Sequence, residues 1–184
     1  MSGKISSQRG GGLKSRAKAA LKATATMDAA KSEDSRKAYG SRIRRATSAD
    51  LPAIVKLDQA TSGRSKPEYW RDKLAQFSDT HADKRVFLVA EVEGQIVGFI
   101  TGEIRDFEFG ADPRGWVFAV SVDPKMRVKN IGTRLFDEIC EIFRRAGVDK
   151  VSTLIERDSE LVLAFFRSQG MIFGRYIQME KDIG

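Results

Sequence analysis

The stretch VDPKMRVKNIGTRL, residues 122–135, joins the end of an apolar run to the first turn of a helix. A proline ends the extended run, and the segment from Lys125 to Arg134 holds four cations and no acidic side chain. A helix N-terminus presents unpaired N–H groups and the positive end of the helix dipole. The stretch therefore predicts an anion site with phosphate as its ligand, although the spacings of a P-loop and of a dinucleotide fingerprint are both absent.

The flanking sequence predicts the elements that this stretch connects. Residues 116–122, WVFAVSV, are so apolar that we expect a strand covered on both faces. Residues 130–147 predict a helix that ends at Gly147. Its apolar face consists of Ile131, Leu135, Ile139 and Ile142.

Periodicity along the rest of the chain predicts one mixed α/β domain, of the α+β kind, in the order β-α-α-β-β-β-α-β-α-β. Before the stretch, we expect a strand at Ile43, a helix over 47–59 with Thr47 or Ser48 as cap and Asp50 in its first turn, and a helix over 66–77. Two strands within 85–107, joined at Glu93-Gly94, and a turn at 109–115 follow. After the stretch and its helix, we expect a strand over 150–156, a helix over 158–170 capped by Asp158 or Ser159, and a last strand over 171–182.

Composition limits the class of protein. A length of 184 residues predicts one domain with an appendage, and 41% hydrophobic residues are enough to form its core. A single cysteine excludes an internal disulfide and favours a reducing, cytoplasmic setting. No apolar run approaches the roughly 20 residues of a membrane helix, so we expect no membrane partner.

The net charge of +7 is concentrated in residues 1–40, which hold nine Lys or Arg and three Asp or Glu. We expect residues 1–40 to be a basic extension, flexible or partly helical, and residues 41–184 to be the folded domain. Organelle targeting and weak binding to nucleic acid or another anionic partner are alternative roles for the extension. The domain itself is nearly neutral, which argues against a nucleic-acid-binding fold.

The domain resembles the GNAT superfamily of acetyl-CoA-dependent N-acyltransferases. Its pyrophosphate loop, Arg/Gln-x-x-Gly-x-Gly/Ala after Val-x-Pro, is similar to Val122-Asp123-Pro124 followed by residues 127–132. The closing FFRSQGM, residues 165–171, is similar to the family's Phe/Leu-Tyr-x-x-x-Gly-Phe. The resemblance covers about residues 42–182. It departs at Val128 and Asn130, where glycine is common in the family; asparagine tolerates a left-handed conformation and valine does not.

The resemblance implies acetyl-CoA as co-substrate, an amine as acceptor and no metal. The backbone of the fourth strand would hold the pantetheine arm, and loop amides would hold the pyrophosphate. A bulge would separate the fourth and fifth strands. The implied cofactor-binding residues are Val120, Ser121, Val122, Arg127, Val128, Lys129, Asn130, Ile131, Gly132 and Thr133.

The catalytic positions that the resemblance implies hold apolar residues in this chain. Positions where family members carry a tyrosine acid or a glutamate base hold Phe166, Leu154 and Trp116. Candidate substitutes are Glu103 as base, Glu156, and Tyr176 as proton donor. Cys140 follows Phe136 at helical spacing and is expected in the core, and His81 is expected in a loop.

Three functions therefore remain open at the level of sequence. The first is an N-acetyltransferase acting on a protein N-terminus, a lysine or a small amine, as a monomer or homodimer. The second is a non-catalytic acyl-CoA-binding regulatory module, and the third is a nucleic-acid-associated protein acting through its basic extension.

Overall fold

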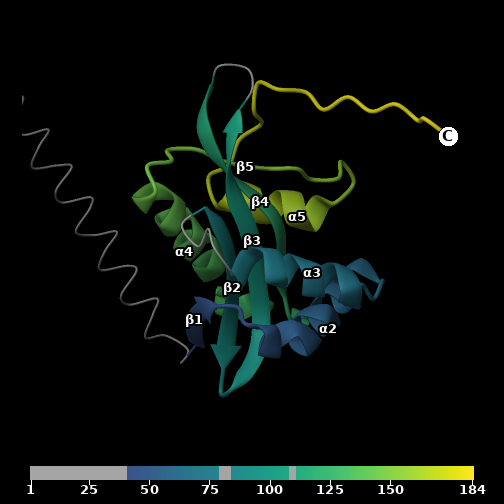
Figure 1. The fold of residues 1–184 in the computed structure, drawn as a ribbon, viewed down its shortest axis with the longest axis vertical. Helices are drawn as coiled ribbons and strands as arrows, with labels where there is room; N and C mark the ends of the chain where they lie inside the picture. Colours follow the sequence, from purple (N-terminus) through teal and green to yellow (C-terminus); the bar gives the residue numbers. More distant parts are fainter. Residues whose placement is uncertain (1–40, 79–83, 108–110) are drawn as a thin grey trace, which may run out of the picture.

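The computed structural model describes residues 41–78, 84–107 and 111–184. Its centre is a five-stranded sheet in the order β1-β2-β3-β4-β5, antiparallel except for the parallel pair β4–β5 (Figure 1). The strands are β1 Ser41–Arg45, β2 Arg85–Val92, β3 Gln95–Phe107, β4 Ala111–Val122 and β5 Val151–Thr153. The helices are α2 Leu51–Ser62, α3 Pro67–Ser78, α4 Ile131–Arg145 and α5 Glu160–Ser168.

The mixed α/β fold and most of the predicted element order are confirmed. The turn at Glu93-Gly94 has positive φ at both residues, 50° and 77°, as a two-residue hairpin between β2 and β3 requires. Helix α4 ends at Arg145, and Gly147, two residues later, has a φ of 85°, the left-handed conformation typical of the residue that follows a helix. The predicted extension over residues 1–40 and His81 lie outside the described residues.

Two apolar clusters cover the two faces of the sheet. On one face, α2 and α3 pack Ile54, Trp70 and Leu74 against Phe87 and Phe99 of β2 and β3. On the other face, the predicted apolar stripe of α4 packs on β2, β3 and β4, and α5 adds Phe166 to this cluster. The central strands are thus buried on both faces, as the apolar sequence of β4 predicts.

A bulge interrupts the pairing of β3 with β4 at Phe118. Thr101 pairs with Ala119, but the next residue, Gly102, pairs with Val117, so Phe118 is the extra residue of β4. Phe118 and Ala119 consequently both lie on the α2/α3 face, whereas Val117 lies on the α4 face. The bulge bends β4 at the middle of the sheet.

Two sequence-based expectations are wrong. The turn expected over 109–115 does not include residues 111–115, because β4 begins at Ala111 and extends the hairpin with β3. The last strand expected over 171–182 is absent, since residues 171–184 form no strand and no helix in this structure. An alternating apolar sequence becomes a strand only when a neighbouring strand pairs with it, and this segment runs away from the sheet (Figure 1).

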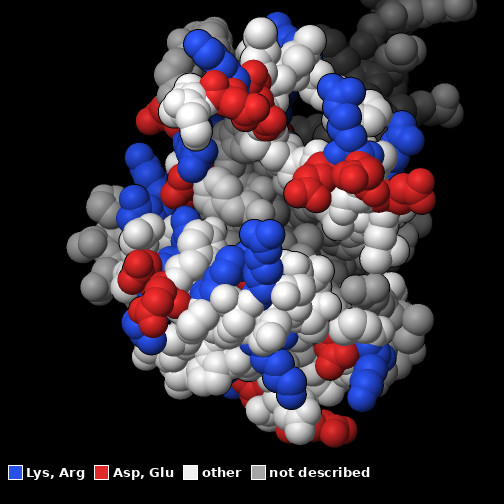
Figure 2. All heavy atoms as spheres, turned by 90° about the vertical axis from the view of Figure 1, so that its right-hand side faces the viewer, with Lys and Arg blue, Asp and Glu red and all other residues white. Residues whose placement is uncertain are grey.

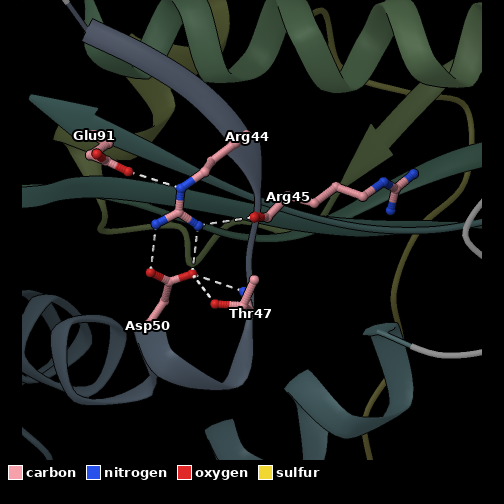
Figure 3. A network of polar contacts seen from close by, with 5 residues as sticks. All are labelled: Arg44, Arg45, Thr47, Asp50 and Glu91. Atoms are coloured by element: carbon pink, nitrogen blue, oxygen red, sulfur yellow. Dashed lines mark hydrogen bonds and ion pairs between the residues drawn. The ribbon is translucent and has the colours of Figure 1, made fainter. Parts of the chain in front are cut away.

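A partly buried ion pair ties the first strand to the turn before the first helix (Figure 3). The Arg44 guanidinium donates to both carboxylate oxygens of Asp50, at 2.7 and 2.8 Å, and to Glu91 of β2 at 2.9 Å. Asp50 also accepts from the backbone N–H of Thr47 at 2.8 Å, which caps the turn before α2. These bonds fix the path of the chain from β1 into α2.

The Arg44 guanidinium, followed by hydrogen bonds from Thr47, holds the pKa of Asp50 below its ordinary value of 3.8. A carboxyl with a lowered folded pKa stabilises the protein at pH above the ordinary value, and that stabilisation is lost as pH falls through the folded pKa. We expect Asp50→Asn to lower the free energy of unfolding by about 3 kcal/mol at neutral pH, because Arg44 loses its buried partner. The difference from the wild type should shrink below pH 4.

Chemical denaturation at pH 7 and at pH 3.5 measures this effect, with the exposed Asp72→Asn as the matched control. A destabilisation that is equal at both pH values would contradict the assignment of the effect to the carboxylate charge.

Candidate functional site

Strands β4 and β5 separate directly after the bulge. Their parallel pairing covers Gly115 to Val117 of β4 and ends at Thr153 of β5, whose hydroxyl donates to the Val117 carbonyl at 3.0 Å. From Phe118 to Val122, β4 has no strand on its β5 side within the described part of the chain. The backbone groups on that side of β4 are available for an extended ligand, and Val120, Ser121 and Val122 lie in this part of the strand.

The predicted phosphate loop leads from this end of β4 into α4. Residues Pro124–Lys129 form a 3₁₀ helix, whose first turn is capped by the Asp123 carboxylate accepting from the Lys125 N–H at 2.9 Å. Asn130 follows with φ 55° and ψ 22°, the left-handed conformation, and α4 starts at the next residue. Val128 lies within the range of this 3₁₀ helix.

In the first turn of α4, backbone groups rather than side chains are available to bind an anion. Ile131 is 1% exposed in the core, a Cβ added to Gly132 would lie 3.1 Å from the Phe165 ring, and the Gln169 amide donates to the Thr133 hydroxyl at 3.2 Å. Arg134 donates to the Ser41 carbonyl at 3.0 Å and so contributes to the link with β1. An anion at this helix end would therefore be held by N–H groups of residues 130–133.

On the α2/α3 face of the sheet, cationic side chains surround Phe118 of the bulge. The Lys73 ammonium of α3 lies 5.4 Å from the centre of the Phe118 ring, and the Arg105 guanidinium of β3 lies 4.8 Å from it. Arg105 donates to the Glu103 carboxylate at 2.6 Å, and Arg85 lies 3.7 Å from the same carboxylate. The side of the molecule seen in Figure 2 is hollowed near its centre, and side chains of both signs border the hollow.

The three candidate catalytic residues lie in different surroundings. Glu103 alternates along β3 with Phe99 and Thr101, which places it on the α2/α3 face, and its side chain is 19% exposed. Glu156 is exposed in the loop between β5 and α5. Tyr176 is 40% exposed, lies outside any strand and stacks on Arg114 at 5.4 Å.

The apolar residues at the family's usual proton-transfer positions do not share one environment. Phe166 is 3% exposed within the α4 cluster, whereas Leu154 is 66% exposed. Cys140 is half-buried, and burial, followed by the charge of Asp137, raises the pKa of its thiol to about 12. A thiol with that pKa is protonated at neutral pH, so Cys140 is no nucleophile.

Other features of the structure do not compete for this site. A cavity of about 460 Å³ lies between β1 and α4 and is lined by residues that include Ile43, Arg45 and Glu138, away from the β4–β5 separation. No group of His, Cys, Asp or Glu side chains suited to a metal ion occurs in the ranges that the structure describes. Within those same ranges, no helix is both long enough and apolar enough to cross a membrane.

The sequence profile of the acetyltransferase (GNAT) family matches residues 51–171, which include the bulge, the loop and α4. The chain belongs to the GNAT acetyltransferase family. This family uses acetyl-CoA as its co-substrate, so the predicted fold, enzyme class and co-substrate class are confirmed at the level of the family.

Similar proteins agree on the fold but not on the acceptor. A mycothiol acetyltransferase of Propionibacterium freudenreichii is 28% identical over 157 residues, which are 82% of this chain and 49% of that protein. The GNAT chain thus spans about half the length of this curated relative. The aminoglycoside N-acetyltransferase AAC(6')-Iy in complex with CoA aligns with TM-score 0.67 and 14% identity over 77% of this chain and 94% of that one. Glucosamine-6-phosphate N-acetyltransferase of Arabidopsis thaliana aligns with TM-score 0.62 and 21% identity over 78% and 99%.

Some residues that shape the GNAT site were not identified from the sequence. Gly102 is one, because a Cβ there would lie 2.3 Å from the Trp116 carbonyl oxygen. A glycine inside a strand pattern is a signal of a bulge or of close backbone approach, and it could have located Phe118. Lys73 and Arg105 carry no such signal, because their proximity to Phe118 follows only from the packing of α3 on the sheet.

Gly102→Ala tests the need for the bulge in this GNAT domain. The new methyl would meet backbone, which no side-chain rotation relieves, so we expect a loss of about 1–3 kcal/mol in the free energy of unfolding. Affinity for acetyl-CoA should fall as well, because β4 can accommodate the methyl only by shifting its register. The control is Thr101→Val, which removes a buried hydroxyl with no hydrogen-bond partner in the described structure. Wild-type stability and affinity in Gly102→Ala would contradict this role.

Substitutions at Asn130 test the loop separately from the bulge. A β-branched residue in the left-handed conformation costs about 1–2 kcal/mol, so we expect Asn130→Val to weaken acetyl-CoA binding by about tenfold. Asn130→Gly adopts that conformation without strain and should bind at least as well as the wild type. Calorimetric titration of the three proteins measures the difference. Equal affinities in folded variants would show that the loop conformation does not contribute to binding.

Proposed function

We propose that this chain transfers the acetyl group of acetyl-CoA to an amine, by direct attack of the amine in a ternary complex. The observation that carries the proposal is the separation of β4 from β5 at Phe118, in a strand that continues through the loop of residues 123–130 to the N-terminus of α4. One continuous path then offers strand backbone to a pantetheine arm and helix amides to a pyrophosphate. Acetyl-CoA supplies the acetyl group as a thioester, whose thiol leaves with an ordinary pKa near 8.5.

The residues present fit this ligand through their backbones. Ser121 directs its hydroxyl away from the β5 side, toward the Leu57 carbonyl at 3.2 Å and the Thr61 hydroxyl at 2.9 Å of α2. Val120 and Val122 pack on the α4 face. The side chains of all three residues are therefore engaged by the protein, and their amide and carbonyl groups remain for the ligand.

The cations beside Phe118 support the deprotonation of an acceptor amine. An amine must lose its proton before it attacks, and a lysine-like pKa near 10.4 makes that costly at neutral pH. Like charges disfavour the charged form of a titrating group. Lys73 and Arg105 would therefore lower the pKa of an ammonium bound next to Phe118.

Glu103 is the proposed acceptor of that proton, directly or through a water molecule. It is joined to Phe118 by Arg105, and its cross-strand neighbour is Trp116, two residues before the bulged position. Glu156 and Tyr176 are second choices, because both are largely exposed and neither is held next to the bulge by a strand.

The proposed acceptor class is a small amine. The similar proteins are named mycothiol acetyltransferase, aminoglycoside N-acetyltransferase and glucosamine-6-phosphate N-acetyltransferase. These names support testing small amines first. A lysine side chain or the N-terminus of a protein is an alternative acceptor, and both are included in the test. A non-catalytic acyl-CoA-binding module is the second candidate, favoured by the buried Phe166 at the position of the family's tyrosine acid.

The test is release of CoA from acetyl-CoA in the presence of an amine panel: alkyl amines, sisomicin, a lysine peptide and a peptide with a free N-terminus. We expect amine-dependent turnover, and Glu103→Gln should lower kcat by about a hundredfold or more. Glu138→Gln, on the opposite face of the sheet, is the matched control and should leave kcat unchanged. Acetyl-CoA binding without turnover of any amine would favour the non-catalytic module.

A further inference from the structure

Three cationic side chains gather near Phe118 on the α2/α3 face, and they share one carboxylate. Lys73 comes from α3, Arg85 from β2 and Arg105 from β3. Arg105 donates to the Glu103 carboxylate at 2.6 Å, and the Arg85 guanidinium lies 3.7 Å from it. In the part of the chain that the structure describes, no other acidic side chain forms an ion pair with any of the three cations. This cation cluster, defined as Lys73, Arg85 and Arg105, therefore carries positive charge that the protein does not balance.

Lys73 is the member of the cation cluster that has no carboxylate partner among the described residues. Its ammonium lies 5.2 Å from the ring centre of Phe77, 5.4 Å from that of Phe118 and 5.7 Å from that of Tyr69. The residue is half-buried. A ring attracts an ammonium less strongly than an anion that accepts its hydrogen bonds. Lys73 can therefore bind an anion beside the proposed acceptor position without breaking an existing ion pair.

The unbalanced charge discriminates between kinds of amine. At neutral pH, an amine with a pKa near 10.4 arrives as an ammonium ion. The cation cluster repels a plain ammonium ion and repels a polyamine more strongly, whereas it attracts a molecule that also carries an anionic group. A carboxylate balances only part of the excess charge, and the remainder still favours the neutral form of the amine, which is the form that attacks. A phosphate, with a charge of about −1.5 to −2, would balance most of it.

We propose that the acceptor is a small amine that carries a carboxylate, as an amino acid does, and that Lys73 and Arg105 bind this carboxylate beside the Phe118 ring. These two members of the cation cluster are the ones that contact this ring, at 5.4 and 4.8 Å from its centre. This substrate class rests on the proposed acetyl transfer. The free amine nitrogen bonds to the acetyl carbonyl carbon, the carbon–sulfur bond of the thioester breaks, and the proton that the nitrogen loses ends on the sulfur of CoA.

Binding of amines to the complex of the protein with CoA tests the carboxylate site without turnover. Titration followed by amide chemical shifts compares each ω-amino acid from glycine to 6-aminohexanoate with the alkyl amine of equal chain length. In the pair β-alanine and propylamine, for example, a carboxylate stands in place of a methyl group. We expect the best amino acid to bind at least about tenfold more tightly than its alkyl partner, and 1,3-diaminopropane to bind more weakly than propylamine. Equal affinities within every pair, or tighter binding of the diamine, would overturn the proposal.

Substitutions at Lys73 assign the preference to this side chain. Lys73→Met keeps most of the length and removes the charge, so the amino acid should lose its advantage over the alkyl amine. Lys73→Arg restores the charge and should retain the advantage. Lys56→Met removes the same charge from the exposed side of α2 and is the matched control. An advantage that persists unchanged in Lys73→Met overturns the proposal.

Acetyl transfer to the same pairs of amines separates the substrate class from the enzyme activity. We expect kcat/KM to follow the order of binding. Tighter binding of the amino acids without acetyl transfer would contradict the activity and support the carboxylate site. Acetyl transfer with equal kcat/KM for both members of every pair would support the activity and overturn the substrate class.

Discussion

The close approach of β4 to β3 at Gly102 is the constraint on which the site depends. Only a hydrogen fits there, because a methyl would lie 2.3 Å from the Trp116 carbonyl oxygen. That approach accommodates the extra residue Phe118, and the extra residue turns the rest of β4 away from β5. The backbone freed in this way runs into the loop before α4. A conformational requirement at one glycine thus aligns the two features proposed to bind the ligand, a strand edge and a helix N-terminus.

Local signals in the sequence were sufficient for the elements whose conformation depends on their own residues. Asn130 illustrates this: it stands where glycine is common, it tolerates φ 55°, and the structure uses that conformation to begin α4. The Glu93-Gly94 turn is a second case. Features that depend on distant partners could not be read from the sequence. The Arg44 contacts join residues from β1, the first turn and β2. Residues 171–182 have a strand pattern but pair with no strand in the described part of the chain.

In the proposed site, backbone groups bind the cofactor and side chains contact the acceptor. This division explains why the fold does not identify the acceptor. The proposed cofactor side of the site consists of amides and carbonyls, whose positions follow from the fold and tolerate sequence change. Proteins of 14 and 21% identity consequently share that fold while bearing the names of different acceptors. The proposed acceptor side consists of Lys73, Arg105 and Glu103, whose identities the fold does not determine. Specificity is therefore a property of these few side chains.

Amide chemical-shift mapping of the ¹⁵N-labelled protein during titration with acetyl-CoA tests the central claim most directly. The account predicts that the largest changes occur at the amides of residues 119–122 and 130–133, on both sides of the phosphate loop, with smaller changes elsewhere. Largest changes around Ile43, Glu138 and Ile142, at the cavity between β1 and α4, or no changes at all, would contradict it.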